Sequence, residues 1–354
     1  MGANFSNYVY WFPAEQEIFL DNWEFILQMV KIKKRKVFYM ADFKLGGLIA
    51  APYTPFDSSG DLNLSVVERQ AGSLVESGVK GAFICGTTGE GLSLTTEERM
   101  QVARRWTEVC RGLPLKVIVH VGHNSQREAI ALARNAGEVG ASAIAALPPF
   151  FFKPGSVDQL VEFMRPVAAA GGGLPFYYYQ IPSMTGVSIP AFDFLQAAAE
   201  RIPQLRGVKF THGDLMDYQR CLRVGDGRYD VAWGVDEMLL GALAVGAKSA
   251  VGSTYNYAAP LYVRMMNAFH KQDLETARKC AGHSVEMIAV LLKHGVLRTG
   301  KATMAMLGID CGPTRSPVSP LSAEEVAIVR QSYERIGFFD WSTSSGASAA
   351  TPVV

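Results

Sequence analysis

A lysine stands inside an apolar run that we expect to be a buried strand: Lys209, flanked by Val208 and Phe210. Lysine is rarely buried without a partner. Removal from water lowers the pKa of its ammonium group and favours the neutral amine. A neutral amine can attack a carbonyl carbon and form a Schiff base, so Lys209 is the candidate nucleophile. The alternative is that Lys209 points outward and its side chain reaches solvent between helices.

A glycine-rich turn follows an earlier apolar run and carries Thr87 and Thr88 between Gly86 and Gly89. Glycines leave backbone N–H groups accessible, and with two hydroxyls such a turn suits a carboxylate or a phosphate. No lysine follows Gly89, so the turn is not the nucleotide-binding P-loop. The alternative is a tight strand–helix turn that holds no ligand.

Three consecutive tyrosines end a further apolar run, and Pro182 follows three residues after the last of them. Side chains alternate along a strand, so Tyr177 and Tyr179 share one face and Tyr178 lies on the other. A phenol at the mouth of an active site could shuttle protons. The alternative is aromatic packing in the core.

Carboxylates and hydroxyls follow the last two apolar runs, in the segments 234–237 and 252–254. Asp236, Glu237 and Ser253 on one rim would suit a polyol. The alternative is that Asp236 and Ser253 cap the helices that follow them. His120 and His123 also end a run, but residues three apart on a strand face opposite sides, so we expect no metal site.

The elements that must position these groups are strands and helices in alternation. Eight short apolar runs lack polar alternation, as expected for strands buried on both faces of a parallel sheet: residues 47–51, 81–85, 116–121, 143–147, 175–180, 207–210, 230–233 and 249–252. Capping-box pairs that start helices lie between several of them: Ser65 with Glu68, Thr95 with Glu98, Ser125 with Glu128 and Ser156 with Gln159. We therefore predict an α/β fold, an eight-stranded (β/α)8 barrel with additional C-terminal helices. In such barrels the reactive groups lie at the carboxyl ends of the strands.

Composition narrows the class of protein. The chain has 354 residues, with 34 Lys plus Arg, 33 Asp plus Glu and a net charge of +1. A nucleic-acid-binding protein would show a strong basic excess. The cysteines are five, which is an odd number, and they are far apart, so the sequence predicts no disulfide framework and favours a reducing cytoplasm.

The two ends differ from the middle. Residues 1–42 hold an aromatic stretch and a basic run, and acidic residues interrupt the stretch, so it is no membrane span. We expect a poorly ordered extension, with Met40 as an alternative start. Residues 43–312 form the predicted barrel, residues 313–341 a helical segment that opens on a capping box of Ser322 with Glu325, and residues 342–354 a disordered tail.

Three motifs in this order resemble the pyruvate-dependent class I aldolases, the superfamily of dihydrodipicolinate synthase and N-acetylneuraminate lyase. They are the turn with Thr87 and Thr88, Tyr179 three residues before Pro182, and Lys209. The resemblance implies that Lys209 forms the Schiff base, that Tyr179 relays protons, and that the two threonines bind the pyruvate carboxylate. It also implies a homotetramer and no metal or organic cofactor.

Within that superfamily the chain resembles the eukaryotic-type N-acetylneuraminate lyases. Met184 stands where the synthases carry an arginine for a second carboxylate. The resemblance assigns sugar-binding roles to Thr211, Gly234, Asp236, Glu237 and Ser253. It implies a carbon–carbon lyase that reversibly cleaves N-acetylneuraminate, a sialic acid, to N-acetylmannosamine and pyruvate.

Some positions depart from the superfamily pattern. Phe151 and Phe152 stand where other members place tyrosine, and Gln180 where Asn or His is common, which leaves proton delivery open. The alternatives are a lyase for a shorter keto-deoxy sugar acid, a dihydrodipicolinate synthase, and a non-catalytic barrel that only binds a ligand.

Overall fold

The computed structural model describes residues 43–342 of the chain. The chain divides into two units, Met1–Phe43 and Lys44–Val354, and the structure concerns the second of them. The extension expected at residues 1–42 and the tail after Ser342 lie outside the described residues.

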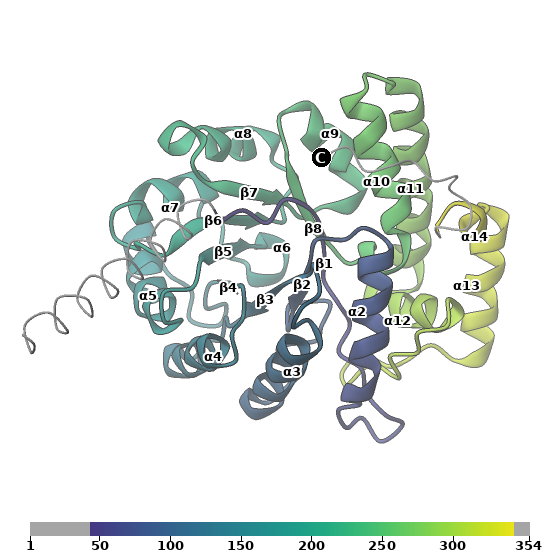
Figure 1. The fold of residues 1–354 in the computed structure, drawn as a ribbon, viewed down its shortest axis with the longest axis horizontal. Coiled ribbons are helices and arrows are strands. Elements are labelled where there is room, and N and C mark those ends of the chain that lie inside the picture. The colour runs from purple at the N-terminus through teal and green to yellow at the C-terminus, as the bar shows by residue number, and fades with distance from the viewer. Residues whose placement is uncertain (1–42, 343–354) are drawn as a thin grey trace, which may run out of the picture. The chain divides into compact units, whose positions relative to one another are not determined.

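Eight parallel strands form a closed barrel in which each strand pairs with its neighbours in sequence and the last pairs with the first (Figure 1). The strands are β1 (Gly47–Ala50), β2 (Gly81–Ile84), β3 (Lys116–His120), β4 (Ala143–Ala146), β5 (Phe176–Gln180), β6 (Leu205–Phe210), β7 (Asp230–Trp233) and β8 (Ser249–Gly252). The predicted (β/α)8 barrel is therefore confirmed, with all eight strands at the expected places.

Helices surround the barrel, and further helices follow the last strand (Figure 1). In the described residues they are α2 (Val67–Glu76), α3 (Thr96–Val109), α4 (Gln126–Glu138), α5 (Val157–Ala170), α6 (Pro182–Thr185), α7 (Ala191–Ala198), α8 (Leu215–Arg223), α9 (Leu239–Ala244), α10 (Tyr255–His270), α11 (Leu274–His294), α12 (Val296–Met306), α13 (Ala323–Arg335) and α14 (Phe338–Trp341). Helix α13 packs on α11 and α12, and α11 packs in turn on α10, the helix that follows β8 and contacts β1.

Helix starts follow the predicted caps at four of five places. At α3 and α13 the capping box is reciprocal, and at α4 and α5 the capping serine accepts the expected backbone hydrogen bond. The prediction for Ser65 is wrong, because Ser65 lies inside a 3-10 turn, Leu64–Val66, and α2 begins at Val67. The Ser65 hydroxyl donates to Asn63 Oδ1 instead, at 2.6 Å.

The alternation of β6 decides which way its lysine points. Val208 and Phe210 face the surrounding helices, where the Phe210 ring stacks on Trp233 with the ring centres 5.9 Å apart. Lys209, between them, therefore faces the barrel interior and is 4% exposed. The alternative of an outward Lys209 that reaches solvent is wrong. In the part of the chain that the structure describes, no helix is long and apolar enough to span a membrane.

Candidate active site at the carboxyl end of the barrel

Lys209 lies between two aromatic faces inside the barrel. Its Nζ is 4.0 Å from the centre of the Phe83 ring and 4.1 Å from the centre of the Tyr179 ring. Burial lowers the pKa of Lys209 to about 7, and the Asp236 carboxylate opposes that shift. The two ring faces attract a cation, but desolvation outweighs them. A large share of Lys209 is therefore the neutral, nucleophilic amine at neutral pH.

Tyr179 is the direct strand partner of Lys209, on the adjacent strand β5. Its neighbour Tyr178 faces outward and packs on Phe194 of α7, so the predicted alternation of the tyrosines is confirmed. Burial raises the pKa of Tyr179 to about 12, which the hydrogen bond to Thr87 partly offsets. The phenol therefore holds its proton at neutral pH and can donate it.

The glycine-rich turn after β2 reaches the same place. Thr87 Oγ1 lies 3.2 Å from the Tyr179 hydroxyl, so the turn and the tyrosine share a hydrogen bond. Thr87 is exposed and Thr88 is half-buried. The ring of Phe83, from the strand that leads into this turn, covers Lys209. The turn thus brings the Thr87 hydroxyl to the phenol, with half-buried Thr88 next to it in the chain.

Asp236 lies at the end of β7, in the short turn Asp236–Met238, and is 6% exposed. Its Oδ2 accepts hydrogen bonds from the backbone N–H and the hydroxyl of Thr254, at 3.0 and 2.6 Å. Its Oδ1 accepts no hydrogen bond of ordinary geometry within the described residues, and the buried Tyr255 hydroxyl interacts with the same carboxylate. Burial raises its pKa to about 6, and the Thr254 hydrogen bonds limit that rise. Asp236 is therefore fixed by one oxygen, and its other oxygen is buried against Gly252.

The remaining predicted sugar ligands lie just after β6, β7 and β8. Thr211 comes after β6, Gly234 after β7 and Ser253 after β8, while Glu237 is half-buried beside Asp236. The hydroxyl of Thr211 is buried and makes no hydrogen bond of ordinary geometry in the described part of the chain, although it interacts with the Tyr179 phenol. It lies against Gly234, where an added Cβ would be only 2.1 Å from it. Neither Asp236 nor Ser253 caps the helix that follows it.

Arg99 and His120 form a buried pair to which sequence reasoning assigned no role. Arg99 is 1% exposed and donates to the backbone carbonyls of His120 and Gly122, at 2.6 and 3.0 Å. His120 Nδ1 lies 3.0 Å from the Cys85 carbonyl, and the Leu147 N–H donates to its Nε2 at 3.3 Å. Burial lowers the pKa of His120 well below its ordinary range. These bonds give His120 a structural role between neighbouring strands.

The positions that depart from the family pattern are mostly on the surface of this unit. Phe151 and Phe152 are 75% and 86% exposed and contact each other edge to face, with the ring centres 5.0 Å apart. Met184 of α6 is exposed as well, whereas Gln180 is buried at the end of β5. Its backbone carbonyl accepts the Thr211 N–H, at 2.9 Å.

Comparisons with known proteins identify the family of this chain. Residues 44–335 match the model of the dihydrodipicolinate synthetase family. The chain is 43% identical over 297 residues to the N-acetylneuraminate lyase of Gallus gallus, a match that covers 83% of this chain and 96% of that protein.

Two solved structures can be set beside this chain. Proteus mirabilis N-acetylneuraminate lyase is 44% identical with a TM-score of 0.81, covering 84% of this chain and 100% of the other. The dihydrodipicolinate synthase of Cyanidioschyzon merolae is 27% identical with a TM-score of 0.77, covering 83% and 98%. The resemblance inferred from the motifs is confirmed, and the chain belongs to the dihydrodipicolinate synthetase family.

Proposed function

We propose that this chain is an N-acetylneuraminate lyase, a Schiff-base aldolase that reversibly cleaves the sugar acid to N-acetylmannosamine and pyruvate. One observation carries the proposal above the others. A lysine is buried inside the barrel, its pKa is lowered to about 7, and a phenol stands on the neighbouring strand. Nucleophilic amines need this depressed pKa to attack a ketone at neutral pH. The similarity to named lyases at 43–44% identity supports the choice of substrate.

The reaction follows from these groups. Neutral Lys209 attacks the ketone carbon of the open-chain substrate, and loss of water gives a protonated imine. The ring faces of Phe83 and Tyr179, about 4 Å from Nζ, stabilise that positive charge. The imine takes up the electron pair of the C3–C4 bond as it breaks, which releases N-acetylmannosamine and leaves an enamine. A proton then adds to the enamine carbon, and water hydrolyses the imine to pyruvate.

Proton movement at C4 involves the phenol of Tyr179. A group with a pKa of about 12 is a poor free base at neutral pH. Tyr179 can accept the C4 hydroxyl proton only as it passes its own proton on, to the substrate carboxylate or along its hydrogen bond to Thr87. Tyr179 therefore relays the proton to the carboxylate held by Thr87 and Thr88, and the same proton returns through Tyr179 to the enamine carbon.

The sugar end of the substrate is assigned to the residues that follow β6, β7 and β8. The Oδ1 of Asp236 and the hydroxyl of Thr211 are both buried and make no hydrogen bond of ordinary geometry in the described residues, with the Tyr255 and Tyr179 hydroxyls as their neighbours. Buried polar atoms without partners carry a free-energy cost that a bound polyol would remove. Gly234, Glu237 and Ser253 complete the proposed set. Exposed Met184 offers no cation for a second carboxylate, which favours a lyase over a synthase.

We place the active enzyme in the cytoplasm as a homotetramer. All five cysteines are buried and free, as a reducing compartment favours. The adjacent exposed rings of Phe151 and Phe152 favour cover by a second copy. Size-exclusion chromatography with light scattering tests the tetramer, and a monomeric mass would contradict it.

A substrate panel tests the proposed reaction. We expect turnover of N-acetylneuraminate, weak cleavage of shorter keto-deoxy sugar acids, and negligible condensation of pyruvate with aspartate semialdehyde. A coupled dehydrogenase measures the pyruvate that cleavage releases or that condensation consumes. A protein that condenses the semialdehyde and leaves N-acetylneuraminate intact would be a synthase, and the proposal would be wrong.

A further inference from the structure

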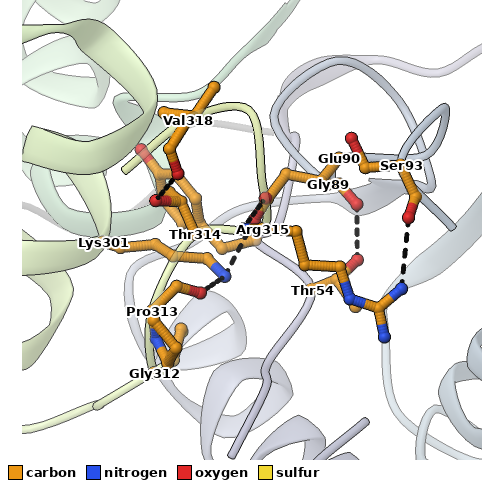
Figure 2. Close-up of polar contacts among 12 residues, drawn as sticks. Thr54, Gly89, Glu90, Ser93, Lys301, Gly312, Pro313, Thr314, Arg315 and Val318 are labelled. Atoms are coloured by element: carbon orange, nitrogen blue, oxygen red, sulfur yellow. Dashed lines mark hydrogen bonds and ion pairs between the residues drawn. The ribbon is translucent and has the colours of Figure 1, made fainter. Parts of the chain in front are cut away.

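Behind the turn that carries Thr87 and Thr88 lies a buried ion pair from the far end of the chain. Lys301 of α12 and Glu90 have 3% and 2% of their side-chain surface exposed, and Lys301 Nζ lies 2.9 Å from Glu90 Oε1 (Figure 2). The same Nζ donates to the Pro313 carbonyl, at 2.6 Å. The other carboxylate oxygen of Glu90 accepts the backbone N–H of Arg315, at 2.8 Å.

Glu90 is part of the turn itself. It has a φ of 51°, in the left-handed region, and its N–H donates to the Thr87 carbonyl at 3.1 Å. The hydroxyl of Thr54 donates to the carbonyl of Gly89 from the other side, at 2.6 Å (Figure 2). A strained residue keeps its conformation only where its surroundings hold it in place. The ion pair holds the side chain of Glu90, and the Arg315 N–H holds its other carboxylate oxygen.

We propose that Lys301 is a positioning residue for the carboxylate-binding turn: its buried ion pair with Glu90 sets the placement of Thr87 and Thr88. The inference rests on the proposed function, in which these threonines bind the pyruvate carboxylate. It also gives the C-terminal segment a part in catalysis, because Pro313 and Arg315 complete the hydrogen bonds of the pair.

Charge burial explains why the pair constrains the turn. The attraction between the two buried charges holds Glu90 against α12, and it is lost in every variant without Lys301. In Lys301→Met the buried Glu90 carboxylate keeps only the Arg315 N–H and the nearby Arg315 guanidinium, which adds a cost in stability. The backbone N–H of Glu90 donates to the Thr87 carbonyl, so a shift of the Glu90 backbone also shifts the turn. We therefore expect loss of Lys301 to weaken capture of the pyruvate carboxylate, although Lys301 is not in contact with Lys209.

The same helix offers a matched control. Arg298, one turn before Lys301 on α12, forms an ion pair with Glu325 of α13. That pair also ties α12 to the C-terminal segment, and neither member makes a described contact with the turn after β2. Arg298→Met therefore removes a cation from the same helix and leaves the turn's supports in place.

The experiment measures imine formation at Lys209 by reductive trapping with cyanoborohydride. Pyruvate is varied to find the concentration that gives half-maximal labelling. Acetone, a ketone without a carboxylate, is the second probe. The proteins are the parent, Lys301→Met, Arg298→Met and the double variant Lys301→Met/Glu90→Gln, each also unfolded in urea. The double variant contains no unpaired buried charge, so it provides a folded protein even where the single variant is unstable.

We expect Lys301→Met to raise the half-saturating pyruvate concentration at least about tenfold, as for a lost hydrogen bond to a charged group. Labelling by acetone should stay within about twofold of the parent, and Arg298→Met should match the parent with both probes. The double variant should unfold at the urea midpoint of the parent. Its pyruvate capture should stay as weak as that of Lys301→Met.

Two results would overturn the assignment. One is a Lys301→Met variant whose half-saturating pyruvate concentration equals that of the parent. The other is a double variant whose pyruvate capture recovers together with its stability, since the pair would then only support the fold. A parent that is not labelled by pyruvate at all would instead refute the proposed function, and this inference with it.

Discussion

Replacing Lys209 by methionine should make the folded protein more stable at neutral pH. Burial lowers the pKa of Lys209 from its ordinary value of 10.5 to about 7, so the native state disfavours the ammonium form that the unfolded chain keeps. A tenfold difference in proton affinity corresponds to about 1.4 kcal/mol. At pH 7 the cost to folding is therefore about 4 kcal/mol, and methionine of similar length and no charge avoids it.

The sign of the pH dependence follows from the same shift. Between pH 7 and 10.5 the unfolded chain binds more protons at this residue than the native state, so the stability of the parent rises with pH. The advantage of Lys209→Met should be about 4 kcal/mol at pH 7 and about 2 kcal/mol at pH 9, and it should vanish near pH 10.5.

Urea unfolding of both proteins at equal concentration measures these differences, because an oligomer's stability depends on concentration. A Lys209→Met variant that is no more stable than the parent at pH 7 would refute the account of a desolvated amine. So would an advantage that grows between pH 7 and pH 9.

Three further predictions concern the same site. The rate of pyruvate capture at low pyruvate should fall about tenfold per pH unit below pH 7 and level off above it, as the neutral fraction of Lys209 does; a rate that is flat down to pH 5.5 would contradict the lowered pKa. Asp236→Ala should reduce N-acetylneuraminate turnover about ten- to a hundredfold and leave pyruvate trapping nearly unchanged; equal losses in both assays would show that Asp236 only ties β7 to β8 through Thr254. Gly252→Ala should reduce sugar-acid turnover in the same way, because the added Cβ would lie 1.8 Å from Asp236 Oδ1 and must displace it; steady-state kinetics that match the parent would mean that this oxygen does not bind the sugar.

The barrel could be predicted because its strands are short, apolar and buried on both faces. Residues 230–233 and 249–252 match β7 and β8 as predicted. At β6 the strand begins two residues before the predicted start, at Leu205, because half-buried Arg206 hides the pattern. Ser65 shows the limit of a local motif, since its hydroxyl bonds to Asn63 and the helix starts later.

The reacting groups could be predicted from the sequence, but the buried residues that hold the neighbouring strands and turn in place could not. Lys209 and Tyr179 stand out because a charge and a phenol interrupt apolar strands, and alternation then gives their direction. The ion pair of Glu90 with Lys301 leaves no such signal, because its members meet only after the whole barrel has closed. Arg99 and His120 are similar cases, since their partners are backbone carbonyls and an N–H that any sequence would supply.

Trapping with borohydride and pyruvate, followed by peptide mass spectrometry, tests the central claim most directly. The parent protein should gain one reduced three-carbon unit per chain, located on Lys209. Lys209→Ala should gain none and should lose at least about a thousandfold in N-acetylneuraminate turnover, which corresponds to roughly 4 kcal/mol of barrier. A label on a different lysine, or none in the parent, would contradict the assignment of Lys209 as the Schiff-base residue.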